Sequence, residues 1–578
     1  MQGTAHWLDQ YRGNTFEWQK HESNGITSFS RPLGLVEHFF DCDGRYYEGR
    51  ADINAQLDLE VFTRLTKNQL EERIILAWTI LRCEKPILLA RALLQENGAT
   101  ANNSTATSNV RLHVEVPQNA RAAVGEASEH AVFLADHYHS VDADDFWFHA
   151  QNTARVLDAS KALAKLFVLP SNELKDSGGG SLRFLMVFAH QIADGLTNYS
   201  CMRAFIRLLN MPLQELRGQV STASKLEGIR QHLPLPQEAH YPRVSGSTAR
   251  QRWFWAITRI LRSVRKPLPE AFPNPLRRKE ARGIVSLSPV YDKVLDYSRP
   301  PMINTLVCRT HMPPSHLQRL QTLCKQVKAT VGAGCWALVA IVMMEIYERN
   351  EPDIPLEERK PFVSGFPLNP RPFLEGHIEL DSLMLAFCDG IVLPFLPSYL
   401  DFDSRLRLLA RQAQRQLAAY QKRARPKDEE AQLQYMSSRG AGRIIANQYV
   451  GSLERADAVL PHHLRKGIDL QGEYRLPISY GQTNGISSIG RRDGLISSGE
   501  YDLEDASKDF VADYRGLEMA VRARTGEFLV AISGGEDGLR AAPSIDIGVM
   551  DPVLVDEWKR RMESILEVGQ QEAPRAKL

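Results

Sequence analysis

The 578-residue sequence lacks the features that define several large classes of protein. Its seven cysteines are scattered and odd in number, and none forms a Cys-x-x-Cys pair: Cys42, Cys83, Cys201, Cys308, Cys324, Cys335 and Cys388. Neither a disulfide framework nor a zinc ribbon is indicated, and a reducing compartment fits this usage best. The formal net charge of +1 provides no overall attraction to nucleic acid or to an anionic membrane.

Long hydrophobic segments are also missing. The first nine residues are polar and contain no apolar segment of the kind found in secretory signals, so we expect a cytoplasmic protein. The longest apolar stretch, 331–346, is interrupted by Gly332 and Gly334 and is shorter than the ~20 residues that a membrane span needs. We therefore expect no membrane span, and we interpret this stretch as a helix in a hydrophobic core.

Length and composition predict a globular protein with more than one domain. Hydrophobic residues make up 43% of the chain and charged residues 24%, which is ordinary for globular proteins. A chain of this length is too long for one compact core. Residues 210–285 are rich in Pro, Arg and Gln and contain no clear strand, so they are expected to be a linker or insertion. We predict an N-terminal lobe over 1–285 and a C-terminal lobe over 286–578.

Periodicity predicts both helices and strands. Apolar residues at helical spacing predict a helix over 57–81, and helices are also expected over 196–209 and 314–327. Residues 165–170 and 182–189 read as a strand hairpin, and 486–489 and 527–533 read as strands of the second half. The second half thus repeats the order of elements of the first half, without visible residue identity.

The most informative segment is the end of that hairpin, where an apolar run from Phe184 leads into His190-x-x-x-Asp194-Gly195. A histidine at the end of a buried strand can titrate near neutral pH and can take a proton from an alcohol or amine. Asp194, at a turn that Gly195 helps to make, is expected to brace the turn rather than to react. This spacing also occurs by chance, and the alternative is that both residues merely end a strand.

Further motifs follow in a fixed order: Arg31-Pro-Leu-Gly-Leu-Val-Glu37, the segment 324–333, Phe366-Pro-Leu-Asn369-Pro-Arg371-Pro and Ser487-Ser488-Ile-Gly490. With the His190 motif they resemble the chloramphenicol-acetyltransferase-like acyltransferase superfamily, and within it the fungal O-acyltransferases of the trichothecene 15-O-acetyltransferase and alcohol acetyltransferase type. The resemblance spans roughly residues 31 to 560. Ser488 stands where asparagine is commoner, Pro370 separates Asn369 from Arg371, and the Asp-Phe-Gly-Trp-Gly motif of the plant branch is absent.

This resemblance implies an α/β fold of two lobes, each with mixed sheets flanked by helices, and a tunnel between them. His190 would be the general base that deprotonates an acceptor hydroxyl as the oxygen attacks the thioester carbonyl of an acyl-CoA. Asp194 would point away from the tunnel and pair with an arginine that the sequence does not identify.

Four other residues are candidates for the site. Ser488 is the leading candidate to stabilise the oxyanion, with Ser479, Tyr480, Thr483 and Ser487 as neighbouring hydroxyls; an ordinary role in a strand or turn is equally compatible with them. Gly195 is a candidate for substrate contact. Asn369 and Arg371 are expected to shape the interface between the lobes rather than to take part in the chemistry.

The sequence therefore predicts an acyl-CoA-dependent O-acyltransferase, an O-acetyltransferase in the first instance, that acts on a secondary metabolite in fungal biosynthesis. A small-molecule alcohol and acetyl-CoA or another acyl-CoA are the expected partners, the protein is expected to be a monomer, and no bound cofactor is expected. The cluster of imidazoles and carboxylates over 137–145 matches no familiar zinc motif, so no metal is expected either. The alternatives are a condensation or cyclase enzyme with a carrier-bound donor, and a non-catalytic binding relative.

Overall fold

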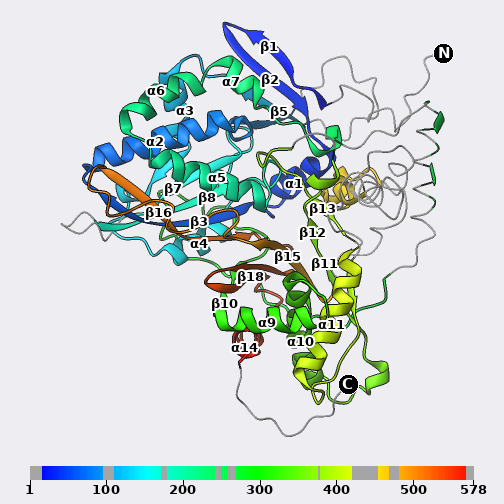
Figure 1. Ribbon diagram of the computed structural model, residues 1–578. Helices are drawn as coiled ribbons and strands as arrows, with labels where there is room; N and C mark the ends of the chain where they lie inside the picture. The colour runs from blue at the N-terminus through cyan, green and yellow to red at the C-terminus, as the bar shows by residue number, and fades with distance from the viewer. Residues whose placement is uncertain are drawn as a thin grey trace, which may run out of the picture.

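The computed structural model describes residues 16–94, 110–170, 179–240, 268–374, 378–388, 390–418, 454–467 and 481–567, together with a few positions between 247 and 260. Two lobes are visible, each built on a sheet with helices packed against it (Figure 1). The upper lobe in this view carries most of the N-terminal half of the chain, and the lower lobe carries most of the C-terminal half. The fold is therefore α/β with mixed sheets, as expected from the sequence.

The first lobe contains a five-stranded sheet. Across it the strands are β16 (Phe510–Val521), β3 (Ile53–Thr63), β8 (Gly179–Phe188), β7 (Ala164–Val168) and β6 (Ala131–Phe133). Strand β8 runs antiparallel to both β3 and β7, which confirms the predicted hairpin. The helices of this lobe are α2 (Lys67–Glu84), α3 (Ala120–Glu129), α4 (Ala143–Asn152), α5 (Gly195–Leu209), α6 (Leu213–Ala223) and α7 (Leu226–Gln231).

A second, smaller sheet in this part of the chain has the order β1 (Gln19–Ser23), β2 (Ile26–Pro32), β5 (Val110–Glu115) and β4 (Arg91–Leu94), with all neighbours antiparallel. Helix α1 (Leu35–Tyr46) follows β2 directly. Every residue of α1 from Leu35 to Gly44 is buried, including its charged residues. This helix therefore lies inside the molecule and not on its surface.

Strand β16 belongs to the C-terminal half of the sequence but completes the sheet of the first lobe. It pairs antiparallel with β3 from Phe510 opposite Thr63 to Val521 opposite Ile53, with an irregularity between Tyr514 and Gly516. Its buried apolar residues join the core of the first lobe. The division of the chain near residue 285 stays a prediction, and this strand crosses from one predicted lobe into the other.

The second lobe is built on a seven-stranded mixed sheet. Its path runs through β10 (Thr310–Met312), β18 (Gly538–Asp546), β17 (Phe528–Gly535), β15 (Asn484–Arg491), β11 (Phe362–Gly365) and β14 (Ile391–Leu393), with β9 (Thr305–Val307) beside β18. Helices α9 (Pro314–Gln326), α10 (Val331–Asn350), α11 (Phe402–Leu417) and α14 (Pro552–Ser564) complete the lobe. A two-stranded ribbon of β12 (Pro367–Leu368) and β13 (Ala386–Phe387) lies near the junction.

Helix α10 is long and apolar enough to cross a membrane, but 78% of its apolar window is buried inside the protein. Its side chains form much of the second hydrophobic core. The interpretation of 331–346 as a core helix is confirmed.

The single helix predicted over 57–81 is wrong in its first third. Residues Leu57, Leu59 and Val61 alternate along β3 and are at most 1% exposed, which is the period of a strand and not that of a helix. The helix α2 begins only after Thr66, whose hydroxyl caps it by accepting the Gln69 amide hydrogen. This capping pair marks the boundary that apolar spacing alone did not show.

Candidate functional site

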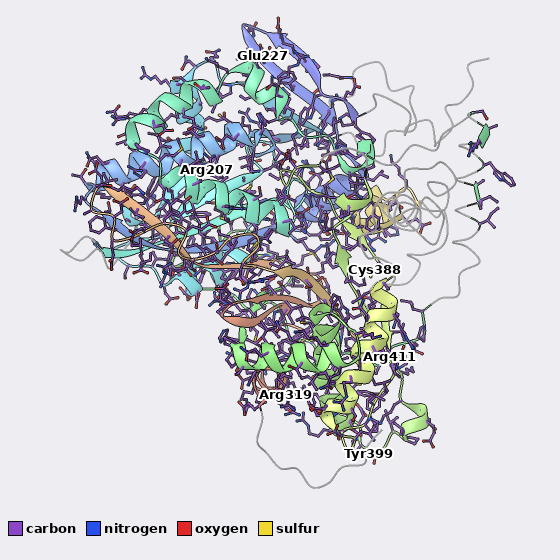
Figure 2. The ribbon with its side chains drawn as sticks, in the orientation of Figure 1. Arg207, Glu227, Arg319, Cys388, Tyr399 and Arg411 are labelled. Atoms are coloured by element: carbon purple, nitrogen blue, oxygen red, sulfur yellow. The ribbon has the colours of Figure 1, made fainter. Side chains whose placement is uncertain are left out.

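A cavity of about 640 Å³ is lined by residues of both lobes. The first lobe contributes α1, the turn after β8 and the start of α5, and the strands β15, β17 and β18 of the second lobe contribute the opposite wall. Cys388, which belongs to the lining, lies where the two lobes meet (Figure 2). Most of the lining is apolar, with a few charged side chains, so the cavity can take a largely apolar small molecule. A tunnel open on two sides stays a prediction.

His190 follows β8 immediately and lines this cavity. Its ring stacks on that of Phe40 with centroids 3.8 Å apart and an angle of 11° between the planes. Burial lowers the pKa of His190 to about 4; the Arg524 cation acts in the same direction, and Asp194 acts against both. The expected titration near neutral pH is therefore not found, because burial disfavours the imidazolium. The imidazole is neutral at pH 7, which is the form that can accept a proton.

The two ring nitrogens of His190 differ in their surroundings. Within the described part of the chain, the buried Nδ1 atom makes no hydrogen bond of standard geometry, although backbone groups of His190 and Ala193 are near enough to raise the pKa. The backbone of His190 itself hydrogen-bonds to the carboxylate of Asp52, which in turn is held by Arg155 at 2.7 and 2.9 Å. The main chain at His190 is thus fixed, while the ring retains hydrogen-bonding capacity.

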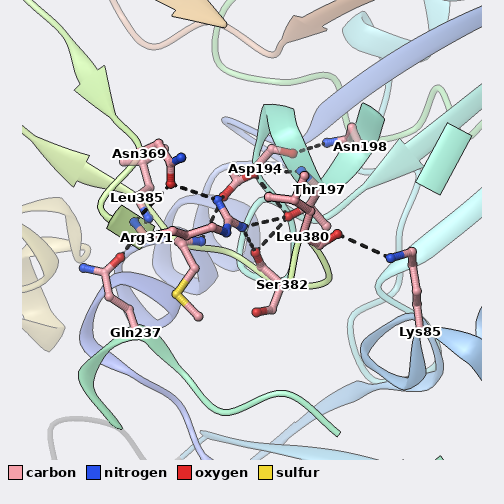
Figure 3. Close-up of polar contacts among 11 residues, drawn as sticks. Lys85, Asp194, Thr197, Asn198, Gln237, Asn369, Arg371, Leu380, Ser382 and Leu385 are labelled. Atoms are coloured by element: carbon pink, nitrogen blue, oxygen red, sulfur yellow. Dashed lines mark hydrogen bonds and ion pairs between the residues drawn. The ribbon is translucent and has the colours of Figure 1, made fainter. Parts of the chain in front are cut away.

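Asp194 is buried and has a full set of partners (Figure 3). It is the N-cap of α5, and one carboxylate oxygen accepts the Thr197 amide hydrogen at 2.9 Å. The other oxygen accepts the Met384 amide hydrogen at 2.9 Å and lies 2.9 Å from Nη1 of Arg371. Arg371 is therefore the arginine that the sequence left unidentified.

Arg371 and Asn369 lie behind the turn and not in the cavity lining. The guanidinium of Arg371 also donates to the carbonyl of Ser382 at 2.6 Å, and Oδ1 of Asn369 accepts the Arg371 amide hydrogen at 3.1 Å. Figure 3 shows how this network draws the segment around Ser382 toward the start of α5. This placement agrees with a structural role at the interface for both residues.

The same segment is fastened at both of its ends. Nζ of Lys85, at the end of α2, donates to the carbonyl of Leu380 at 3.3 Å, and Oε1 of Gln237 accepts the Leu385 amide hydrogen at 2.8 Å. The turn that carries His190 is thus attached directly to a segment 190 residues further along the chain, and Lys85 and Gln237 hold that segment in turn.

The structure separates the candidate hydroxyl groups. Ser488 is not part of the cavity lining, and its hydroxyl accepts the Gly490 amide hydrogen at 3.3 Å, whereas its neighbour Ser487 lines the cavity. The Thr483 hydroxyl is buried and donates to the carbonyl of Phe272 at 3.0 Å, which is a structural contact. Ser479 and Tyr480 lie outside the described residues. Among the described hydroxyls, Ser487 is placed better than Ser488 to contact a ligand.

Gly195 lines the cavity at the first position of α5. A Cβ atom added there would lie 3.3 Å from Cγ2 of Ile489, which is on the same face of β15 as Ser487. The absence of a side chain at this position lets strand β15 of the second lobe approach the His190 turn closely.

Sequence reasoning missed the contribution of α1. Arg31 and Glu37 form a buried pair with two contacts of 2.7 Å, and Glu37 also accepts the Gly34 amide hydrogen at 2.7 Å at the start of the helix. Phe40 lies three residues beyond Glu37, nearly one helical turn, and carries the ring that stacks on His190. The motif from Arg31 to Glu37 is the sequence feature that could have indicated this contribution, because its buried ion pair holds the start of the helix that reaches the site.

Metal binding finds no support in the described part of the chain. No group of three or more His, Cys, Asp and Glu side chains there is arranged to hold an ion. In the cluster over 137–145, Asp142 caps α4 and Asp145 accepts the hydroxyl hydrogen of Tyr291 at 2.7 Å.

Comparison with known proteins identifies the fold. No protein-family model and no curated protein matches the sequence. A trichothecene 15-O-acetyltransferase from Fusarium sporotrichioides superposes with a TM-score of 0.62 over 96% of this chain and 97% of its own, at 11% identity. The first condensation domain of the calcium-dependent antibiotic synthetase gives 0.48 at 14% identity, covering 93% and 97%. The starter condensation domain of rhizomide synthetase with C8-CoA gives 0.49 at 11% identity, covering 93% and 94%.

The protein therefore has the two-lobed chloramphenicol-acetyltransferase-like fold, and the resemblance drawn from the short motifs is confirmed at the level of the fold. At this level of identity the likeness carries no information about the substrate.

Proposed function

We propose that the chain is an O-acyltransferase that moves an acyl group, in the first instance an acetyl group, from coenzyme A to a hydroxyl of a secondary metabolite. The observation that supports this most is the placement of His190: a neutral imidazole on the wall of a largely apolar cavity shared by two lobes. The fold of a fungal O-acetyltransferase supports the same class of reaction and suggests a fungal biosynthetic setting.

In the proposed reaction His190 acts as the general base. Because Nδ1 is buried, Nε2 is the nitrogen available to a substrate. It takes the proton of the acceptor hydroxyl while the oxygen bonds to the thioester carbonyl carbon, and the carbonyl electrons move to oxygen. When the tetrahedral intermediate collapses, the carbon–sulfur bond breaks and the imidazolium returns the proton to the thiolate of coenzyme A. The products are an ester and the free thiol.

Three features of the site support this reaction. The apolar lining of the cavity excludes water and strengthens electrostatic interactions with the developing oxyanion. Ser487 supplies a hydroxyl in that lining as the candidate donor to the oxyanion. Asp194 and Arg371 take no part in the chemistry; they hold the turn, and thereby the ring, in place.

The test is the release of thiol from acetyl-CoA by the purified protein, with a panel of terpenoid and polyketide alcohols. We expect release that depends on the acceptor and that falls about 10²–10⁴-fold in His190→Ala, the usual contribution of a general base. His149→Ala is the matched control: its ring contacts the Tyr297 hydroxyl at 2.8 Å and does not line the cavity, so its rate should equal that of the wild type.

Two results would overturn the proposal. If neither acetyl-CoA nor longer acyl-CoA releases thiol with any acceptor, the donor is not coenzyme A, and a carrier-bound donor becomes the reaction to test. If thiol release persists unchanged in His190→Ala, the general-base mechanism is wrong.

A further inference from the structure

Helix α1 reaches the site in two ways, and the first is the contact between Phe40 and His190. With planes 11° apart and centroids 3.8 Å apart, the two rings are stacked face to face. Phe40 is 3% exposed and belongs to a small core with Phe39 and Leu385, so its own ring has little room to turn. A ring stacked on a fixed ring can rotate only by losing that contact, and the His190 plane is therefore held by Phe40.

The second contribution of α1 is an ion pair that holds a cation in the cavity wall. Asp43 is fully buried; it accepts from Nη2 of Arg524 at 2.7 Å and from Nε of Arg50 at 2.8 Å. The Arg524 guanidinium also lies over the rings of Phe39 and Phe40, 5.4 and 5.9 Å from their centroids. Arg524 lines the cavity together with His190.

These contacts are connected through α1. This helix supplies the Phe40 ring that stacks on His190, and the Asp43 carboxylate that holds the Arg524 cation in the same cavity wall. We propose that α1 is a positioning element of the reaction, in which Phe40 sets the plane of the His190 ring and Asp43 holds the Arg524 cation in the cavity wall that this ring shares. This inference rests on the proposed role of His190 as a base. Phe40 and Arg524 act through His190 and are positioning residues.

The charged groups around His190 come from several elements, and Arg524 differs from the others in its effect. Asp194, at the start of α5, favours the protonated imidazole and is paired with Arg371 behind the turn, whereas Arg524 disfavours it and is paired with Asp43. Asp52, before β3, faces the backbone of His190 and is paired with Arg155. Six further charged residues line the cavity: Arg309, Arg455, Glu518, Glu527, Arg540 and Glu563. Of these, Glu527 pairs with Arg524.

Burial and Arg524 thus act together to lower the pKa of His190, against the opposing effect of Asp194. Burial is the larger cause, and a cation that Asp43 holds in the wall adds to it by disfavouring the imidazolium. Because Asp43 has a second partner in Arg50, removal of the Arg524 charge does not leave the buried carboxylate unpaired. A charge-removing variant at this position should therefore still fold.

The first test is a titration of the His190 imidazole by NMR in the full-length protein labelled at histidine, with His190→Ala to assign the signal. In Arg524→Gln the titration midpoint should move upward from that of the wild type, whereas Arg524→Lys, which keeps the charge, should leave it nearly unchanged. This measurement needs no substrate. A midpoint in Arg524→Gln equal to that of the wild type would overturn the part of the inference that concerns Arg524.

The second test is kinetic and concerns Phe40. In Phe40→Leu, which keeps an apolar side chain but no plane, kcat should fall about tenfold or more with little change in KM, because a misoriented base acts on a normally bound substrate. Phe40→Tyr restores a ring and should recover most of kcat. Phe146→Leu, at a fully buried position outside the cavity, is the control for a general loss of core packing and should keep the wild-type kcat.

The outcomes separate this inference from the proposed function. If the wild type turns over and the kcat values of Phe40→Leu and Phe146→Leu are equal, the positioning role of Phe40 is wrong. The proposed function then remains intact. If no donor is turned over at all, the proposed function is wrong. The NMR titration still decides whether Arg524 lowers the pKa of His190.

Discussion

His190 and Asp194, at the two ends of one turn, are only four residues apart, yet they differ in how many polar groups of the protein contact their side chains. The Asp194 carboxylate accepts two backbone amide hydrogens and pairs with Arg371. The His190 ring contacts Phe40 by stacking and has a buried nitrogen without a hydrogen bond in the described residues. One end of the turn is saturated with protein contacts, and the ring at the other end lines the cavity.

This difference separates a structural residue from a reactive one. Buried polar groups in folded proteins are normally paired, and a fully paired group is held in place by its partners. A carboxylate whose oxygens are all engaged cannot also approach a substrate, but it can hold the start of α5 and the segment around Ser382 together. The comparison supports the proposal that His190 carries the chemistry and Asp194 supports the turn, and the following experiments test it.

The largest expected effect is on stability, at the saturated end of the turn. Asp194→Ala should lower the free energy of unfolding by about 3–5 kcal/mol, because it leaves the buried Arg371 cation without its partner. Chemical denaturation followed by tryptophan fluorescence measures this change.

The double variant Asp194→Ala/Arg371→Ala is the control, because removing both charges should recover part of the lost stability. A single variant as stable as the wild type would mean that the ion pair does not hold the turn.

A smaller effect is expected on the opposite wall of the cavity, where Ser487 and Ser488 make a matched pair. Ser487→Ala should lower kcat roughly tenfold, below the 10²–10³ typical of a dedicated oxyanion donor, because it removes one hydroxyl from the lining. Ser488→Ala should leave kcat unchanged. Equal losses in both variants, or a loss only in Ser488→Ala, would contradict the placement of the cavity wall.

The smallest expected effect is on the pH dependence of stability. The pKa of His190 is about 4 in the folded protein and near its ordinary value of 6.5 in the unfolded chain. Between these values the unfolded chain binds more protons, so His190 makes the wild type lose stability as the pH falls from 6.5 toward 4.

Relative to His190→Ala, this loss should be at most about 1.4 kcal/mol per pH unit, because one proton is involved. Denaturation of both proteins at pH 7 and pH 5 measures it. His38 and His130, whose pKa values burial also lowers to about 4, are present in both proteins and cancel in the comparison. If the free energy of unfolding changes equally with pH in the two proteins, the pKa of His190 is not lowered in the folded protein.

Much of the local structure around the site could be predicted from the sequence. The uninterrupted apolar run before His190 predicted a buried strand, and β8 pairs with β3 along its whole length and with β7 over residues 184–188, where the apolar run lies. The helix expected over 196–209 is α5, which begins one residue earlier because Asp194 caps it. Apolar periodicity carried this information because each element buries a continuous face or stripe.

The predictions that depended on distant contacts were less complete. Ser488 was preferred to Ser487 from its place in a short motif, and only the direction of alternate side chains on β15 shows which of the two lines the cavity. The contribution of α1 was not predicted, because nothing local indicates that Phe40 meets a histidine 150 residues away. The division near residue 285 likewise places β16 in the C-terminal lobe, although its partner β3 belongs to the first.

The sequence by itself determined the fold class, the strand and turn that carry His190, and the order of short motifs that points to the acyltransferase fold. These depend on periodicity, on capping residues and on turn residues, which act within a few positions along the chain. The tertiary structure alone decided that Arg371 is the partner of Asp194, that Phe40 and Arg524 surround His190, and which serine lines the cavity. Such contacts join segments that are far apart in the chain, so they are set by how the lobes pack and not by local spacing.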